Sequence, residues 1–349
     1  MKKISIVGIA GIPACYGGFE TLVENLTQYS SGRVSYTVFC SGKIYAERLK
    51  EHNGANLKYI NLHANGMQSI PYDIISLFQS RKSDVILILG VSGCIALPLI
   101  RMISKAKIIT NIDGLEWKRN KWNAAIKFFL KFSERMAVKF SDVVIADNYQ
   151  ITKYVKESYD VNAETIAYGG DHVLTGGEIG ISSNYYLSLC RIEPENNVEM
   201  ILETFSRTQK NLKFVGNWNS SDFGKRMIKK YSEFTNIEMI APVYNLDELF
   251  VLRSKCKGYV HGHSAGGTNP SLVEIMHFAK PVFAFDCSFN RYTTDNRAIY
   301  FADTVDLVDK LTDEELLSAE MQECALSMQE IARTRYTWKT IAESYEALY

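Results

Sequence analysis

The feature that most constrains the fold is a repeated alternation of short apolar segments with segments of helical spacing. Ile4–Val7 and Val85–Leu89 exemplify the apolar segments, and Phe19–Tyr29 exemplifies the helical ones. Short apolar strands separated by helices predict a parallel β-sheet that is covered by helices on both faces. Ligands of such sheets bind beyond the carboxyl ends of the strands, so the residues that follow each strand are candidates for function.

The length of 349 residues is too great for one hydrophobic core and predicts two domains. A glycine-containing segment, Tyr168–Asp171, is the expected boundary, because a second series of strands and helices begins at Tyr185–Leu189. This series includes an expected helix over Leu246–Lys255, and an acidic amphipathic helix is expected over Leu311–Ile331. We therefore expect an N-terminal Rossmann-like domain over residues 1–170 and a C-terminal one over 171–335. The last helix, within 336–349, is expected to pack back on the first domain.

The composition is that of a soluble globular protein, with 46% hydrophobic and 22% charged residues. The seven cysteines are scattered and odd in number, which indicates neither a disulfide framework nor a zinc site. No secretory signal is expected, because Met1-Lys2-Lys3 leads directly into a strand. The most apolar run, Val85–Ile100, is shorter than the ~20 residues of a membrane span. We therefore expect a cytoplasmic protein without a bound metal.

Charge is divided unevenly along a chain whose net charge is zero. Residues 1–170 hold 21 Lys and Arg against 14 Asp and Glu, and the remaining residues hold 18 against 25. In 117–140, seven Lys and Arg and the single acid Glu134 are interleaved with two Trp and four Phe. A basic helix with large aromatics is typical of a segment that rests on an anionic membrane. Its apolar face can equally be domain core. Nothing else in the chain supports nucleic acid, the other polyanion it could bind.

A second candidate region, His261–Asp286, reads as a strand end, a glycine-rich turn, a helix that opens at Asn269-Pro270-Ser271 and a further strand. Proline is tolerated in a first helical turn because the amides there lack intrahelical partners. Such amides behind two glycines can bind an anion. Glu274, one turn further on, is placed to accept a hydrogen bond from a sugar hydroxyl. This combination favours a nucleotide, and the alternative is an ordinary βαβ turn with a surface glutamate.

The loop after the first strand, GIAGIPACYGGFE, has glycines at 8, 11, 17 and 18. This spacing does not fit GxGxxG, and the loop is too long for the tight turn of a dinucleotide site. A flexible loop remains, which ends in Gly17-Gly18 at a helix start where a ligand can approach the backbone. Cys15 in this loop is either reactive or simply a small side chain.

Three charged residues follow predicted strands. Asp113 and Glu116 are candidates for binding sugar hydroxyls or accepting a proton, and the alternative for Asp113 is a helix cap. Arg191 can hold a diphosphate through its planar guanidinium, and the alternative is a structural salt bridge.

Four motifs stand in the order found in a known family. GIPACYGGFETLVENL, DGLEWKRNKW, RIEPENN and HGHSAGGTNPSLVEIM resemble the bacterial rhamnosyltransferases of capsule and exopolysaccharide assembly. That branch is similar to the large retaining glycosyltransferase family four, which contains sucrose synthases and the mannosyltransferases of glycolipid assembly. The resemblance covers nearly the whole chain. It implies the α/β fold called GT-B, in which two Rossmann-like domains with parallel sheets face each other across a cleft.

The resemblance also implies roles for the matching residues. Arg191 and the amides of Thr268–Leu272 would bind the donor diphosphate, and Glu274 a ribose or deoxyribose hydroxyl. Asp113 would take the place of a sugar-contacting histidine. The implied catalytic residues are Asp113, Arg191 and His263. The implied donor-binding residues are Gly17, Gly18, Arg191, Ser264, Gly266, Gly267, Thr268, Asn269, Ser271, Leu272 and Glu274. The implied acceptor-binding residues are Tyr16, Glu116 and Trp117.

Two positions depart from the family pattern. Many relatives carry a glutamate where this chain has Gly266, and a lysine where it has Asn196. The missing carboxylate removes an acceptor for sugar hydroxyls, which suits a 6-deoxy sugar. The missing lysine leaves the diphosphate less neutralised, and Arg191, Lys225 or Arg226 can compensate.

The activity implied by the resemblance is transfer of a hexose or deoxyhexose, namely L-rhamnose from dTDP-rhamnose, with retention. The acceptor would be a lipid-linked saccharide at the inner face of the cell membrane. No cofactor or divalent metal is expected, because charge stabilisation and domain closure supply the catalysis. The alternatives are a nucleotide-sugar epimerase or hydrolase, and a catalytically silent sugar-nucleotide-binding protein. An NAD-dependent oxidoreductase ranks last because of the long first loop.

Overall fold

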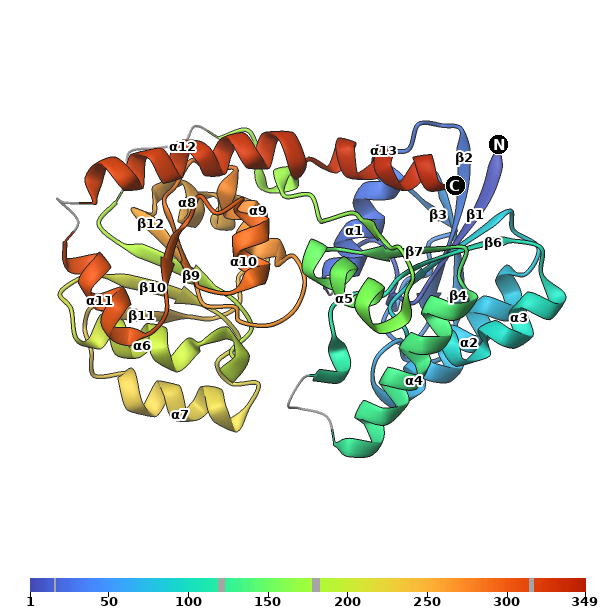
Figure 1. Cartoon of the computed structure of the whole chain (residues 1–349), viewed down its shortest axis with the longest axis horizontal. Helices are drawn as coiled ribbons and strands as arrows, with labels where there is room; N and C mark the ends of the chain where they lie inside the picture. Colours follow the sequence, from blue (N-terminus) through green and yellow to red (C-terminus); the bar gives the residue numbers. More distant parts are fainter. Residues whose placement is uncertain (16, 119–122, 178–182, 314–316) are drawn as a thin grey trace. The chain divides into compact units, whose positions relative to one another are not determined.

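The chain forms two compact units, each built around its own sheet (Figure 1). Unit 1 comprises Met1–Ala167 and Trp338–Tyr349, and unit 2 comprises Tyr168–Thr337. The sequence-based boundary, 170/171, lies three residues from the observed one. The computed structural model describes residues 1–15, 17–118, 123–177, 183–313 and 317–349.

The sheet of unit 1 has the strand order β3-β4-β2-β1-β5-β6-β7-β8, and only the β3–β4 pair is antiparallel. From β1 the chain builds outward through β2 and β4 on one side, and then from β5 to β8 on the other. The order therefore reverses between β1 and β5. The strands are β1 (Lys2–Val7), β2 (Val34–Ser41), β3 (Glu51–His52), β4 (Ala55–Ile60), β5 (Val85–Leu89), β6 (Lys107–Asn111), β7 (Val143–Ala146) and β8 (Glu164–Thr165).

The helices of unit 1 include the last helix of the chain. Tyr345, on that helix, accepts a hydrogen bond from Asn111 Nδ2 (2.8 Å), and Lys2 Nζ donates to the carbonyl of Tyr349 (2.7 Å). The C-terminal segment therefore belongs to the first unit. The α-helices are α1 (Gly18–Gln28), α2 (Ser69–Ser80), α3 (Leu97–Ile103), α4 (Ala124–Phe140), α5 (Tyr149–Tyr159) and α13 (Trp338–Leu348). Short 3₁₀ turns are η1 (Gly66–Gln68), η2 (Cys94–Ala96) and η3 (Glu116–Lys118).

The sheet of unit 2 is wholly parallel, in the order β11-β10-β9-β12-β13-β14, and it reverses between β9 and β12. The strands are β9 (Tyr186–Leu189), β10 (Leu212–Val215), β11 (Ile237–Ile240), β12 (Gly258–His261), β13 (Val282–Phe285) and β14 (Ile299–Phe301). The α-helices are α6 (Val198–Ser206), α7 (Asp222–Tyr231), α8 (Leu246–Lys255), α9 (Pro270–Met276), α10 (Ser288–Thr293), α11 (Thr304–Thr312) and α12 (Ser318–Arg335). The 3₁₀ turns are η4 (Asp171–Val173) and η5 (Pro194–Asn196).

The central strands of both sheets are covered on both faces. All five residues of β5 are buried, which explains why this strand is a continuous apolar run rather than an alternating one. Burial of each such Val, Ile or Leu side chain stabilises the fold by about 1.5–3 kcal/mol. Within the described ranges, no helix combines the length and the apolar character needed to cross a bilayer.

Candidate functional site

The point of strand reversal in unit 2 brings two loops together at the carboxyl edge of the sheet. In the loop after β12, Ser264 donates from its amide (3.0 Å) and its hydroxyl (2.7 Å) to the carbonyl of Glu195, in the loop after β9. Asn197 Nδ2 donates to the carbonyl of Gly262 (2.9 Å). Ligands of open parallel sheets bind at such a point of reversal, so these loops form the candidate site.

Asn196 connects the same loops through its side chain. Its Nδ2 donates to the carbonyl of Arg191 (2.7 Å), and its Oδ1 lies 2.7 Å from Nδ1 of His263. His263 is only 8% exposed. At Gly266, whose φ is +131°, an added Cβ would come within 2.8 Å of His263 Nε2. The two positions that depart from the family pattern, 196 and 266, thus lie on either side of one imidazole.

Arg191 presents its guanidinium to solvent at the end of β9, with 64% of the side chain exposed. Its Nε pairs with the carboxylate of Glu193, two residues further on, at 3.9 Å. This long, local contact does not tie Arg191 to another element, so the guanidinium can reach an anion.

The helix start at α9 is more self-contained than the sequence suggested. Asn269 caps the helix, because its Oδ1 accepts from the amide (3.0 Å) and the hydroxyl (2.8 Å) of Ser271. The amide of Leu272 donates to the carbonyl of Asn269 (3.1 Å). The expectation that the amides of 268–272 all face a ligand is therefore wrong for Ser271 and Leu272, and Pro270 has no N–H.

Glu274 is not the lone surface glutamate of the alternative interpretation. Arg253, on α8 and 3% exposed, donates from Nη2 to Glu274 Oε2. His172, in η4, lies 3.6 Å from Glu274 Oε1, and burial lowers the pKa of this histidine below its usual value. Arg253 Nη1 is buried with no partner among the described residues. Sequence inspection missed Arg253, because a helical arginine looks like any surface arginine until its burial is known.

In unit 1, two carboxylates of α1, the buried Glu20 and the partly exposed Glu24, hold the loop after β1. Glu20 accepts from the amides of Ala10 (2.7 Å) and Gly17 (3.1 Å), and Glu24 accepts from the amide of Ala14 (2.9 Å). Burial raises the pKa of Glu20, while the bond from Ala10 opposes that rise. These bonds attach the amides of Ala10, Ala14 and Gly17 in the loop to side chains of α1. The amide of Gly17 is bound to Glu20 and does not point toward a ligand.

The other residues of unit 1 that the sequence singled out make separate local contacts. Asp113 follows β6 with a φ of +61°, and its amide donates to Asn111 Oδ1 (2.9 Å). The next α-helix, α4, is capped by Asn123 instead. Glu116 begins η3, and Tyr16 lies outside the described residues. Cys15 Sγ donates to Tyr45 Oη at 3.3 Å.

Trp117 belongs to a polar cluster around Glu134, which is 2% exposed. Glu134 accepts from Trp117 Nε1 (3.0 Å), Tyr154 Oη (2.6 Å) and Tyr159 Oη (2.6 Å), and pairs with Lys131 Nζ (3.1 Å). The Lys131 ammonium also lies over the rings of Trp117, Tyr154 and Tyr159, at 4.5–5.0 Å from their centroids. Glu134, the single acid of the basic segment, therefore binds the polar side chains of this cluster together.

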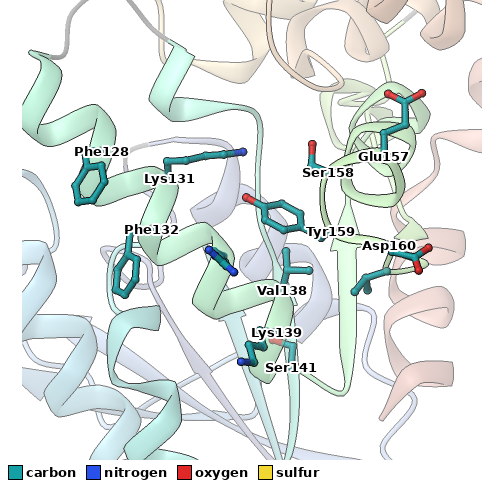
Figure 2. Close-up of a pocket in the computed structure, with 12 residues that line it drawn as sticks. Phe128, Lys131, Phe132, Val138, Lys139, Ser141, Glu157, Ser158, Tyr159 and Asp160 are labelled. Atoms are coloured by element: carbon teal, nitrogen blue, oxygen red, sulfur yellow. The ribbon is translucent and has the colours of Figure 1, made fainter.

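The outer side of α4 carries exposed aromatics beside exposed cations. Phe128 is 75% and Phe132 41% exposed, whereas the buried positions of this helix are Ser133, Glu134, Ala137 and Val138. The interpretation of these aromatics as domain core is therefore wrong for Phe128 and Phe132. A cavity of about 990 Å³ lies between α4 and the end of α5. Figure 2 shows Lys131 pointing toward Tyr159, with Phe128 and Phe132 on another side of α4.

Within the described ranges, no three His, Cys, Asp or Glu side chains gather in a way that could hold a metal ion. A family model described as "Domain of unknown function (DUF1972)" matches residues 1–171. A search of the curated proteins found no match.

Solved structures share the fold over the whole chain. Sucrose-phosphate synthase from Thermosynechococcus elongatus has a TM-score of 0.80 at 12% identity, covering 100% of this chain and 98% of that one. HepE of Anabaena in complex with UDP-glucose has a TM-score of 0.75 at 14% identity, covering 100% and 99%. TarM of S. aureus, in complex with UDP among other ligands, has a TM-score of 0.61 at 16% identity, covering 79% and 59%. The expected fold class, two parallel-sheet α/β domains of the GT-B type, is confirmed.

Proposed function

We propose that this protein is a glycosyltransferase that takes its sugar from a nucleotide-sugar donor bound to unit 2. The observation that carries the proposal is the reversal point of the second sheet, where an exposed arginine, a buried histidine and a glycine-rich turn meet. The fold shared with sucrose-phosphate synthase and with HepE in complex with UDP-glucose supports it. Binding at a reversal point follows the general rule for open α/β sheets.

The donor diphosphate is assigned to Arg191 and the amides of the Gly266–Thr268 turn. The guanidinium offers a planar pair of N–H donors, which match two phosphate oxygens. Glu274 is assigned to a hydroxyl of the nucleoside sugar, because Arg253 and His172 hold its carboxylate in place while 14% of the side chain stays exposed. The turn itself is formed by Ser264, Gly267, Thr268 and Asn269. It is stabilised by the hydrogen bonds that Ser271 and Leu272 donate to Asn269.

The sugar and the stereochemistry rest on the sequence resemblance. The proposed donor is dTDP-L-rhamnose, and Gly266, which offers no carboxylate for a further hydroxyl, suits a 6-deoxy sugar. The proposed reaction retains the anomeric configuration. The leaving phosphate takes the acceptor proton, and Arg191 stabilises the negative charge that develops on that phosphate. The roles proposed in unit 1 are those that the resemblance implies: a catalytic residue at Asp113, donor-binding residues at Gly17 and Gly18, and acceptor-binding residues at Tyr16, Glu116 and Trp117.

The proposed acceptor is a lipid-linked saccharide of bacterial surface polysaccharide synthesis, reached from an anionic membrane face. The exposed rings of Phe128 and Phe132 and the exposed cations Arg135 and Lys139 on α4 support this partner. No carboxylate among the described residues pairs with Arg135 or Lys139, whereas Lys131 is bound to Glu134. The neighbouring helix α3 adds Leu99, 56% exposed, and Met102, 81% exposed.

Vesicle binding tests the membrane assignment. The double variant Arg135→Glu, Lys139→Glu should bind anionic vesicles at least about tenfold more weakly, because each cation near such a surface contributes about 1 kcal/mol. The matched control, Lys153→Glu with Lys156→Glu, makes the same charge change on α5. An equal loss of vesicle affinity in both variants would show that only the net charge of the protein matters. The assignment of α4 as the membrane-binding surface would then be wrong.

Transfer itself is tested with purified protein, dTDP-rhamnose and a lipid-linked acceptor. The expected result is sugar transfer by the wild type and at least about tenfold slower transfer by Arg191→Ala. Full activity of that variant would sink the assignment. Turnover of the donor without any acceptor would favour the epimerase or hydrolase, and donor binding without transfer to any acceptor would favour a silent binding protein.

A further inference from the structure

The hydrogen bonds of Asn196 define the protonation pattern of His263. The carbonyl of Arg191 can only accept, so the Asn196 atom that meets it (2.7 Å) must be the Nδ2 donor. The other amide atom, Oδ1, is then an acceptor facing His263 Nδ1 at 2.7 Å. The proton of the neutral imidazole therefore sits on Nδ1, and the acceptor lone pair of the ring is on Nε2.

The Nε2 atom of His263 lies beside Gly266. Nε2 is the nearest atom to the place where a Cβ on residue 266 would stand, at 2.8 Å, and Cε1 follows at 3.4 Å. At that distance any other residue at 266 would displace the ring. The imidazole nitrogen thus lies on the side of the turn from which a side chain at 266 would project.

The surrounding loops hold the ring in this orientation. Asn290 Nδ2, on α10, donates to the carbonyl of His263 (2.8 Å), and Ser264 is bound to Glu195 from both its amide and its hydroxyl. An added Cβ on Gly262 would come within 2.2 Å of the carbonyl of Asn196, so the two loops are in close contact. A preorganised polar atom loses little freedom when it binds a ligand.

We propose that His263 Nε2 accepts a hydrogen bond from a hydroxyl group of the sugar being transferred, and that Asn196 is the positioning residue that fixes the ring tautomer for this contact. The inference rests on the proposed function, because it needs a sugar donor at the reversal point. It explains Asn196 and Gly266 together: the first orients the imidazole, and the second leaves room for it. A neutral nitrogen then takes the place of a carboxylate at position 266.

The proposal fixes the direction of a pH effect. Only neutral imidazole can accept at Nε2, so donor affinity should rise as pH increases through the pKa of His263. Other titratable or charged groups lie on the elements around this ring: His261 on β12 has its ring centroid 6.0 Å away, Arg191 and Glu193 follow β9, and the Cys287 thiol donates to the carbonyl of His263. Asp286 and Arg291 form their own ion pair (2.5 Å). The His263 resonance must therefore be followed directly.

The first measurement needs no substrate. A two-dimensional ¹H–¹⁵N spectrum of the full-length protein assigns the imidazole tautomer of His263. The wild type should show protonated Nδ1 in the neutral form, and Asn196→Ala should lose that preference. The matched control is Asn211→Ala, since Asn211 is an exposed asparagine that also donates to a carbonyl (2.9 Å). A neutral wild-type ring protonated on Nε2 would overturn the role of Asn196.

The second measurement is the donor affinity by calorimetry between pH 5.5 and 8.5. Wild-type affinity for the donor should rise with pH, and Asn196→Ala should bind about two- to tenfold more weakly at pH 8, while Asn211→Ala matches the wild type. Asn196→Asp keeps an acceptor for Nδ1–H and should recover part of the loss. Affinity that falls as pH rises would mean that protonated His263 contacts phosphate, and would overturn the hydroxyl contact. If no nucleotide sugar binds the wild type, the proposed function and the contact fail together, while the tautomer still decides the role of Asn196.

Discussion

The loops at the carboxyl edges of the two sheets are held by side chains of different charge. In unit 1, the loops at the reversal point are held by acids: Glu20 binds the loop after β1, and Asp73 accepts from Ser92 after β5 (2.5 Å). In unit 2, neutral Asn196 joins the corresponding loops, and the cation Arg191 stays exposed. Acidic side chains thus hold the loops at the first edge, whereas an exposed cation stands at the second, so the same architecture is specialised by a few side chains.

The largest expected effect concerns the Glu274–Arg253 pair. Removing one partner of a buried ion pair costs about 3–5 kcal/mol, so Glu274→Ala should lower the melting temperature of unit 2 by roughly 6–20 °C. The control is Glu199→Ala, whose carboxylate pairs with Lys230 at an exposed site and contributes about 0–1 kcal/mol. Differential scanning calorimetry compares the two. Similar small losses would show that Arg253 does not depend on Glu274. Activity lost in Glu274→Ala must therefore be read together with this stability loss.

The second effect sharpens the description of unit 1. Burial raises the pKa of Asp73 to about 7, and its bond from Ser92 opposes the rise. The folded state therefore binds more protons than the unfolded state between pH 4 and 7, so stability should fall as pH rises across this window. The fall is of the order of 4 kcal/mol, since each pKa unit is about 1.4 kcal/mol. Urea unfolding of Asp73→Asn at several pH values should show a flatter profile. An unchanged profile would mean that Asp73 is not the group responsible.

The third effect tests whether Arg191 in unit 2 attracts the donor diphosphate. Arg191→Ala removes an exposed guanidinium, so it should leave the melting temperature of the free protein unchanged. It should weaken donor binding by about 1.5–3 kcal/mol, the usual contribution of a hydrogen bond to a charged group. Arg207→Ala, which removes an exposed arginine at the C-cap of α6 that pairs with Glu203, is the control. Equal binding by both variants would move the diphosphate away from Arg191.

Much of this architecture could be predicted from sequence, because the periodicity of apolar residues reports the strands directly. Val85–Leu89 and Leu246–Lys255 were expected with the observed bounds. One acidic helix expected over Leu311–Ile331 was wrong, since α11 ends at Thr312 and α12 begins at Ser318. A continuous helical period does not reveal where packing ends one helix and begins another.

The candidate site was predicted less completely, for a physical reason. Arg191 and His263 follow strands, and position along the chain was enough to single them out. Arg253 and the meaning of Asn196 depend on which side chains meet across distant loops, and sequence spacing does not reveal that. Gly266 was noted for the carboxylate it lacks, whereas the structure relates it to the ring of His263.

The most direct test of the central claim is a thermal-shift screen of nucleoside diphosphate sugars against the wild type and Arg191→Ala. A ligand that binds only the folded state raises the melting temperature by mass action. The account predicts that at least one nucleotide sugar, dTDP-rhamnose first among them, raises the melting temperature of the wild type and has a smaller effect on Arg191→Ala. No shift with any nucleotide sugar, or an equal shift in both proteins, would contradict it.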